Sequence, residues 1–366
     1  MIKFLDLAAQ YESIKPKIDA AIANVIRDTA VIGGKYVKEF EQQFADYVGL
    51  KHCIGVANGT DALEIAIEAL GLPPGSDIIV PGNSFIASSE AVTRCGHKVV
   101  FADVDHGCYT LTAETVLSKI TERTKAVIAV HIYGHPCDMD GLLEICDEHG
   151  LMLIEDCAQA HGARYKGRSV GTFGQFAAYS FYPGKNLGAY GDAGALTTQD
   201  EGLSIRAVKI ANHGRIAKYD HELEGRNSRL DGLQAAILSA KLPYLESWTQ
   251  RRIEIADYYL QHLAGIDGLI LPVRQSWARQ VYHLFVVRTT RRDELKAFLA
   301  ALGIETGIHY PIALPKLNAY SYIGSPDVNA FYNRTDKTLL SLPIGEHLTL
   351  ESADVVATAV RKFFTL

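Results

Sequence analysis

Short apolar runs alternate with amphipathic stretches between residues 50 and 200, and this alternation restricts the fold more than any other feature of the chain. The predicted strands are 52–57, 77–81, 98–104, 125–134 and 151–158. The predicted helices between them are 61–71, 87–96, 111–120 and 138–150. Strands that alternate with helices favour a mostly parallel sheet whose faces are covered by those helices. The first half of the chain is therefore expected to form an α/β domain.

After Arg229 the pattern changes to a long helical stretch, 229–265, in which Pro243 is expected to kink or end the helix. The later segments are a strand-like run at 281–290, a helical pattern at 293–303 and the stretch 304–311. We therefore predict two domains. The first, 1–245, is a large α/β domain with an N-terminal helical segment, and the second, 246–366, is a small C-terminal α+β domain.

The composition is that of an ordinary globular protein, because 48% of the 366 residues are hydrophobic and 21% are charged. With 36 basic and 42 acidic residues, the chain offers no basic surface for nucleic acid or for an anionic membrane. Charges interrupt the N-terminal stretch where a signal peptide needs an apolar core, and no apolar run reaches the ~18 residues that cross a membrane. We expect a soluble, cytoplasmic protein whose six scattered cysteines are reduced.

One cluster, HIYGHPCDMD, holds residue types that bind metal ions, namely His131, His135, Cys137 and Asp138. The segment is predicted as a strand that runs into a Pro/Gly turn, and not as a helix that would place both histidines on one face. Because no second pair of ligands stands out in the sequence, we expect no metal site.

Ligands of α/β sheets bind beyond the carboxyl ends of the strands, so the residues that follow each apolar run are the candidates for a site. Asn58, Gly59 and Thr60 follow the first strand and open a helix. A glycine, a hydroxyl and free amides at a helix N-terminus suit a phosphate, although plain N-capping is the alternative. Asp156 stands at the tip of another buried strand, where an isolated acid costs several kcal/mol unless a cation pairs with it.

The apolar segment FAAYS, 176–180, is predicted as a buried strand, and Lys185 follows it in the stretch SFYPGKNLGAYGDAGA. The proline and glycines around this lysine favour a fixed, irregular turn. A P-loop is excluded because its first glycine and its final Ser or Thr are missing, while a solvated loop cation is the alternative. Pyridoxal phosphate requires a lysine amine for its aldehyde, a carboxylate for its ring nitrogen, and amides and hydroxyls for its phosphate. Lys185, Asp156 and the turn after the first strand together match these requirements.

Five motifs carry a resemblance to a known family. They are NGTDAL, EDCAQAHGARYKG, SFYPGKNLGAYGDAGA, NSRLDGLQAAIL and GIHYP, in this order. Together they resemble the sugar-nucleotide aminotransferases of the DegT/DnrJ/EryC1/StrS family, and the resemblance covers essentially the whole chain. It implies an aspartate aminotransferase-like fold, pyridoxal phosphate fold type I, and a homodimer with shared active sites.

The resemblance also implies roles for residues around the cofactor. Lys185 would form the Schiff base and move the proton during transamination, with its pKa lowered by cationic surroundings and by desolvation. Asp156 would pair with the pyridinium nitrogen, and Gln159 would lie near the phenolic oxygen. Phe85 would stack on the ring unless it is an ordinary core residue. The implied phosphate ligands are Gly59, Thr60, Ser180 and, from the neighbouring subunit, Asn227.

For the sugar nucleotide, the family pattern implies contacts from Tyr182, Lys218, Tyr219, Arg229, His309 and Tyr310. An arginine suits a diphosphate because its guanidinium binds two oxygens at once, although a salt bridge is the alternative for Arg229. The implied reaction is a ping-pong transfer of an amino group from glutamate to a keto-sugar nucleotide. The favoured acceptor is a dTDP-3-oxo-6-deoxyhexose, which would give a dTDP-3-amino-3,6-dideoxyhexose.

Other substrates and classes stay open at this point. The acceptor could be a UDP-linked 3-oxo or 4-oxo sugar, because the stretch PIALPKLNAY lacks a histidine that many relatives have after HYP. Dehydratases on the same scaffold carry histidine in place of Lys185, which disfavours that class. A non-catalytic regulator that binds sugar nucleotide or cofactor is a further class. The sequence does not fix the nucleotide base, the sugar stereochemistry or the pathway.

Overall fold

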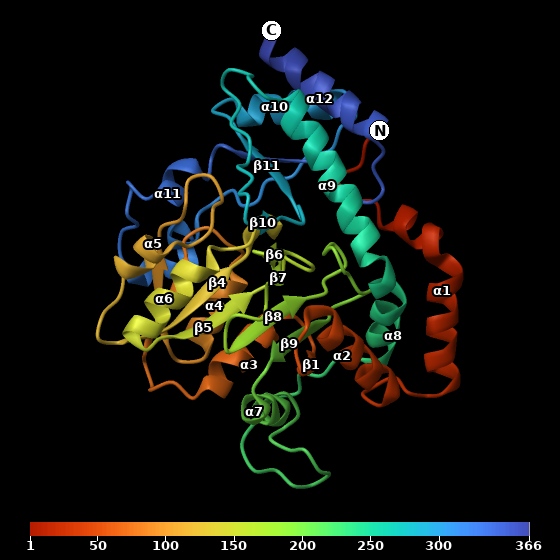
Figure 1. The fold of residues 1–366 in the computed structure, drawn as a ribbon, viewed down its shortest axis with the longest axis vertical. Helices are drawn as coiled ribbons and strands as arrows, with labels where there is room; N and C mark the ends of the chain where they lie inside the picture. The colour runs from red at the N-terminus through yellow and green to blue at the C-terminus, as the bar shows by residue number, and fades with distance from the viewer. Residues whose placement is uncertain (366) are drawn as a thin grey trace.

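Figure 1 shows the computed structural model, which describes residues 1–365. Its centre is a seven-stranded sheet in the order β1-β9-β8-β5-β4-β2-β3. The strands are β1 (His52–Val56), β2 (Asp77–Pro81), β3 (Lys98–Ala102), β4 (Thr124–Val130), β5 (Met152–Asp156), β8 (Phe176–Ser180) and β9 (Gly194–Thr198). β9 is antiparallel to β1 and β8, whereas the other neighbouring pairs are parallel. The predicted α/β architecture is therefore confirmed.

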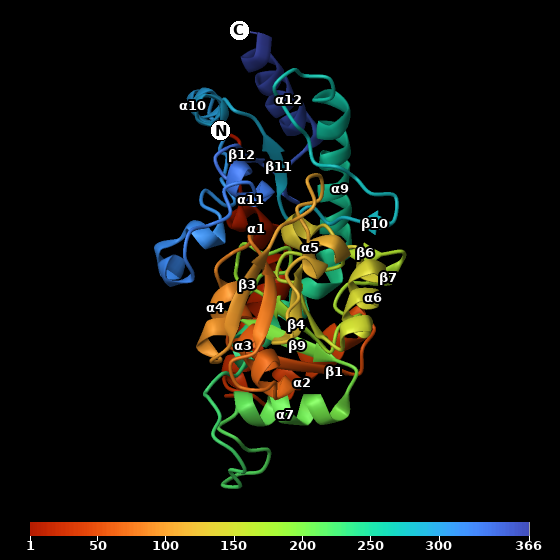
Figure 2. The same ribbon diagram turned by 90° about the vertical axis from the view of Figure 1, so that its left-hand side faces the viewer.

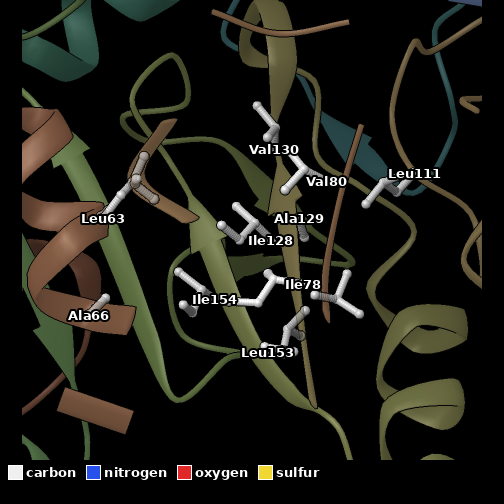
Figure 3. Close-up of a cluster of buried hydrophobic side chains, with 14 of the residues drawn as sticks. Leu63, Ala66, Ile78, Val80, Leu111, Ile128, Ala129, Val130, Leu153 and Ile154 are labelled. Atoms are coloured by element: carbon white, nitrogen blue, oxygen red, sulfur yellow. The ribbon is translucent and has the colours of Figure 1, made fainter. Parts of the chain in front are cut away.

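The strands of this sheet are apolar along most of their length because helices cover both faces. Ile78, Val80, Ile128 and Ile154 are buried together in the main core (Figure 3). Burying side chains of this size stabilises the fold by roughly 1.5–3 kcal/mol each. The helices of this part are α2 (Lys35–Val48), α3 (Gly59–Leu70), α4 (Ala87–Arg94), α5 (Ala113–Leu117), α6 (Met139–His149), α7 (Glu201–Ala211) and α8 (Gly232–Lys241). The helix predicted over 111–120 is real but shorter, since α5 ends at Leu117.

A second core lies beyond the large sheet. Its elements are α9 (Leu245–His262), β11 (Phe285–Arg288), α10 (Arg292–Ala301), β12 (Leu339–Leu342) and α12 (Leu350–Thr365). β11 and β12 pair antiparallel, and Tyr259, Phe285 and Leu299 are among the side chains buried between this sheet and its helices. Pro243 lies in a short turn, η2 (Leu242–Tyr244), that separates α8 from α9, as predicted. Among residues 1–365, no helix has the length and apolar character needed to span a bilayer.

The chain after residue 245 does not pack only on itself. β10 (Ala278–Arg279) pairs with β6 (Arg164–Tyr165), which in turn pairs with β7 (Arg168–Ser169). The segment that holds η3 (Leu314–Lys316), η4 (Asn318–Ile323) and α11 (Phe331–Thr335) lies against β2 and β3. There Leu314 N donates to Gly82 O (2.9 Å), and the Tyr320 hydroxyl donates to Ser89 Oγ (2.6 Å). The division into 1–245 and 246–366 stays a prediction.

The N-terminus crosses from one part to the other. Residues 1–6 lie beside the second core, and α1 (Leu7–Arg27) then runs back to pack on α8 (Figures 1 and 2). Ile2 forms a parallel bridge with Ile304, and the Asp6 side chain accepts a hydrogen bond from Ala9 N, which caps α1. The first residues of the chain are therefore bound to the C-terminal part of the chain, near Ile304.

The connection between α7 and α8, residues 212–231, extends away from the body as a loop (Figures 1 and 2). The base of the loop is fixed, because Arg226 forms ion pairs with Glu64 and Glu68 on α3. The tip is exposed, and Tyr219 there has 78% of its surface accessible.

Candidate active site

A cavity of about 810 Å³ opens at the carboxyl ends of β4, β5 and β8, a size typical of small-molecule sites. It lies between the large sheet and the C-terminal part of the chain. The predicted site residues that line it are Gly59, Thr60, Phe85, Asp156, Gln159, Ser180, Tyr182, Lys185, His309 and Tyr310. Residues from five separate segments of the chain therefore meet at one place.

Lys185 presents its amine to this cavity from the turn that follows β8. The turn is tight, because Lys185 N donates to Tyr182 O (2.8 Å) and a side chain at Gly188 would overlap the backbone of Pro183. Within the described chain the amine makes no hydrogen bond and no ion pair. Burial lowers the pKa of Lys185 to about 8, and the Asp156 carboxylate acts in the opposite direction. The expected lowering of this pKa is present, but its cause is burial and not cationic surroundings.

Asp156 ends β5 at the wall of the cavity and is buried. Its carboxylate accepts hydrogen bonds from Ser88 Oγ (2.7 Å) and from Ala158 N (3.1 Å). Ser88 is in turn in contact with Ser84 Oγ (2.8 Å). These neutral donors orient the carboxylate without neutralising it, so a cation within the cavity is its natural partner.

The turn between β1 and α3 lies very close to the end of β8. Asn58 Oδ1 accepts from Asp61 N (2.8 Å), so the predicted N-cap exists. Within residues 1–365 the N–H groups of Gly59 and Thr60 have no hydrogen-bond partner, and both residues line the cavity. A Cβ at Gly59 would come within 2.6 Å of Ser180 Cβ, so only glycine lets the helix start approach the end of β8. The turn thus both caps α3 and leaves two N–H groups at the cavity, an arrangement that suits an anion.

An aromatic and amide wall closes another side of the cavity. Phe85 is 54% exposed, which excludes the alternative of an ordinary core residue, and its ring lies 5.9 Å from that of Tyr310. Gln159 Oε1 accepts from Tyr133 N (2.6 Å), and its Nε2 donates to the Tyr310 hydroxyl (3.0 Å). Burial raises the pKa of Tyr310, so its hydroxyl stays protonated at neutral pH.

Several residues at the cavity were not found from the sequence, among them Ser88, Arg252 and His283. Arg252 is 3% exposed, donates to Ile344 O (3.1 Å) and pairs with Glu346 (3.1 Å). His283 meets the side chain of Asn186, the residue after Lys185 (3.1 Å). Burial holds the pKa of His283 well below its usual range, and burial with the Lys185 amine lowers that of His309 to about 4. No local motif marks these residues.

Four of the predicted residues lie outside the cavity lining of the described chain. Lys218 and Tyr219 are at the exposed tip of the 212–231 loop, where the lysine amine lies over the tyrosine ring. Asn227 is exposed and bridges Asn212, and Arg229 is partly buried with its Nε unpartnered within residues 1–365. Their implied contacts are therefore not made to this chain's own cavity.

Of the residues considered from the sequence as metal ligands, only His131 belongs to the group of potential metal ligands found close together in residues 1–365. His131, Glu155 and Cys157 are buried with their side-chain atoms close together. Glu155 accepts three backbone N–H groups from the 171–174 loop and contacts His131 Nε2 (3.0 Å), so its lone pairs are occupied. His135 turns away and donates to a backbone carbonyl (2.7 Å). Glu155 therefore anchors the loop between β7 and β8.

The residues at the cavity fit pyridoxal phosphate. The unpartnered Lys185 amine suits the aldehyde of that cofactor, and the unpartnered amides of the β1–α3 turn suit its phosphate. The buried acid suits the ring nitrogen, and the exposed aromatic face suits the ring plane. Fold and site together define a pyridoxal-phosphate-dependent aminotransferase of fold type I.

The chain belongs to the DegT/DnrJ/EryC1/StrS aminotransferase family, which matches residues 12–361. It is 45% identical to dTDP-3-amino-3,4,6-trideoxy-alpha-D-glucose transaminase of Streptomyces venezuelae, over 99% of this chain and 96% of that protein. It is 40% identical to UDP-2-acetamido-2-deoxy-3-oxo-D-glucuronate aminotransferase of Pseudomonas aeruginosa, over 98% and 99%. The crystal structure of S. venezuelae DesV in complex with a ketimine intermediate has a TM-score of 0.97 at 45% identity, covering 100% and 99%. The resemblance found in the sequence motifs is thereby confirmed, and the protein is a sugar aminotransferase.

Proposed function

We propose that this enzyme transfers the amino group of glutamate to carbon 3 of a dTDP-3-oxo-6-deoxyhexose. The observation that carries the amino transfer is the unpartnered Lys185 amine in a cavity that also holds the buried acid Asp156. The choice of acceptor is supported by the 45% identity to a transaminase whose name is that of a dTDP-3-amino sugar. The 40% identity to a UDP-3-oxo-glucuronate aminotransferase keeps a UDP-linked acceptor as the alternative.

Each residue of the cavity has a physical task in this reaction. Pyridoxal phosphate, when bound, supplies the aldehyde and the electron sink. Lys185 Nζ, with its pKa at about 8, takes a proton from the carbon that carries the amino group and returns it after the shift. The Asp156 carboxylate would pair with the positively charged ring nitrogen of the cofactor at the cavity wall. Gly59 and Thr60 would donate their N–H groups to its phosphate.

We further propose that Lys218, Tyr219, Asn227 and Arg229 complete the cavity of a second copy of the chain. Their position outside this chain's own cavity, on or next to a loop that projects into solvent, supports this proposal. Mixing Lys185→Ala with Arg229→Ala tests it, because a heterodimer of two inactive chains would contain one complete site. Recovery of about a quarter of the wild-type sites is expected from random pairing in a twofold dimer. No recovery, with mixed dimers present, would contradict shared sites.

The substrate is tested with a cofactor-loaded Lys185→Ala variant and a panel of dTDP- and UDP-linked 3-amino and 4-amino sugars. Without the lysine to displace it, the correct amino sugar stays attached to the cofactor and is detected by native mass spectrometry. We expect retention of a dTDP-3-amino-3,6-dideoxyhexose. Lys209→Ala, on the distant helix α7, is the matched control and should release every compound. Retention of only a UDP-linked or a 4-amino sugar would overturn the acceptor, and retention of none would overturn the function.

A further inference from the structure

The first residues of the chain form part of the cavity wall. Phe4 and Leu5, which precede α1, both line it. Their backbone is fixed to the second core, because Ile2 N donates to Gly303 O (2.8 Å) and Glu305 N donates to Ile2 O (2.9 Å). Phe4 N also donates to the Glu305 carboxylate (2.9 Å). The segment is therefore held in place like an additional strand, and is not a free tail.

Both side chains contact residues of the site. The Phe4 ring stacks on the His309 ring, with 5.7 Å between centroids and 17° between planes. Leu5 lies beside Gly184, because a Cβ built there would be 3.4 Å from Leu5 Cδ2. Gly184 directly precedes Lys185. The segment thus covers an imidazole on one side of the cavity and the lysine turn on the other.

A buried polar network holds the start of α1 next to the same turn. Gln10 is 4% exposed, and its Oε1 accepts from Lys241 Nζ (2.8 Å) while its Nε2 donates to Glu346 Oε1 (2.6 Å). Lys241 is fully buried and also donates to Gly188 O (2.7 Å), three residues beyond Lys185. Breaking such a network leaves a buried charge unpaired, so the segment has one strongly preferred position.

We propose that Phe4 and Leu5 are positioning residues of this enzyme, which orient the sugar acceptor through His309 and exclude water from the Lys185 amine. Neither side chain has a hydrogen-bonding group, so each acts through shape and desolvation. Water exclusion agrees with burial being the main cause that lowers the Lys185 pKa. The inference about the acceptor rests on the proposed function, whereas the inference about water depends only on the bound cofactor.

The test compares full-length, cofactor-loaded Phe4→Ala and Leu5→Ala with Ile2→Ala. Ile2 packs against the second core and lies outside the cavity lining of residues 1–365, so Ile2→Ala reports a merely structural loss. Two quantities are measured for each variant. The first is kcat/KM for the sugar nucleotide and for glutamate in separate half-reactions, and the second is the rate at which hydroxylamine captures the cofactor.

We expect Phe4→Ala to lower kcat/KM about tenfold for the sugar nucleotide and less than twofold for glutamate, with Phe4→Tyr restoring it. Leu5→Ala should raise the hydroxylamine rate about tenfold, since solvent then reaches the lysine turn. Ile2→Ala should lower Tm and leave both quantities unchanged. Equal losses in the two half-reactions would overturn the acceptor role, and an unchanged hydroxylamine rate would overturn the water exclusion. If the wild-type enzyme aminates no sugar nucleotide, the proposed function fails. The hydroxylamine rates then still decide whether Leu5 excludes water from the Lys185 amine.

Discussion

The protonation of Lys185 offers a sharp test of how the cavity works. Burial lowers the pKa of this amine to about 8, and the Asp156 carboxylate raises it, so Asp156→Asn should lower it further. At pH 7 a pKa of about 8 leaves roughly one amine in ten unprotonated, against roughly one in 2,500 at the ordinary value of ~10.4. The cavity thus makes the free amine roughly 200-fold more abundant. Asp156→Asn should increase the reactivity of Lys185 at neutral pH while it abolishes amino transfer.

The assay is competitive acetylation of the cofactor-free protein from pH 6 to pH 11, read out at Lys185 by mass spectrometry. We expect a midpoint near 8 in the wild type and a lower one in Asp156→Asn. Asp192→Asn is the matched control, because this carboxylate also lines the cavity but does not act on the Lys185 pKa. A wild-type midpoint near the ordinary value, or a higher midpoint in Asp156→Asn, would refute the reasoning.

The same titration has a consequence for stability, with a defined sign. The unfolded chain binds the Lys185 proton up to the ordinary pKa of ~10.4, whereas the folded protein releases it near pH 8. Between these values the unfolded state therefore holds more protons, and the free energy of unfolding of the cofactor-free protein should rise with pH. Lys185→Met should remove this rise in urea unfolding curves, and an unchanged slope in that variant would assign the effect to other groups.

Two further predictions concern the frame of the site. Gly59→Ala should weaken pyridoxal phosphate at least tenfold, because the new Cβ lies 2.6 Å from Ser180 Cβ and forces the helix start away from β8. A spectroscopic titration measures this, and an unchanged Kd would contradict the cradle. Glu155→Gln should lower the free energy of unfolding by about 2–4 kcal/mol, since three loop N–H groups lose a charged acceptor. Urea unfolding would contradict this anchor if the loss were below about 0.5 kcal/mol.

Most of the sheet could be predicted from the sequence because its strands are continuous apolar runs, which local pattern reveals. The same logic placed Asp156 and Lys185 at one edge, since residues after parallel strands share the carboxyl side of the sheet. The length of the helix predicted at 111–120 was overestimated, because an apolar spacing does not show where a helix begins or ends, and α5 covers only Ala113–Leu117.

The other side of the cavity could not be predicted in this way. Ser88 lies within a helix and Arg252 in a long helical stretch, and neither position differs locally from an ordinary surface-facing one. Phe4 and Leu5 belong to no motif that indicates a binding site. Their placement depends on contacts across some 300 residues, such as the one between Phe4 and Glu305, for which the sequence carries no local signal.

The sequence by itself determined the α/β sheet, the lysine, the acid and the glycine turn, because each follows from its own strand end and from motifs shared with a family. Only the tertiary structure decided what surrounds them: the neutral imidazole of His309, the serine behind Asp156 and the apolar N-terminal wall. The reason is physical, since burial and the hydrogen-bond partners set a pKa and the shape of a cavity, and both are made by segments distant in sequence.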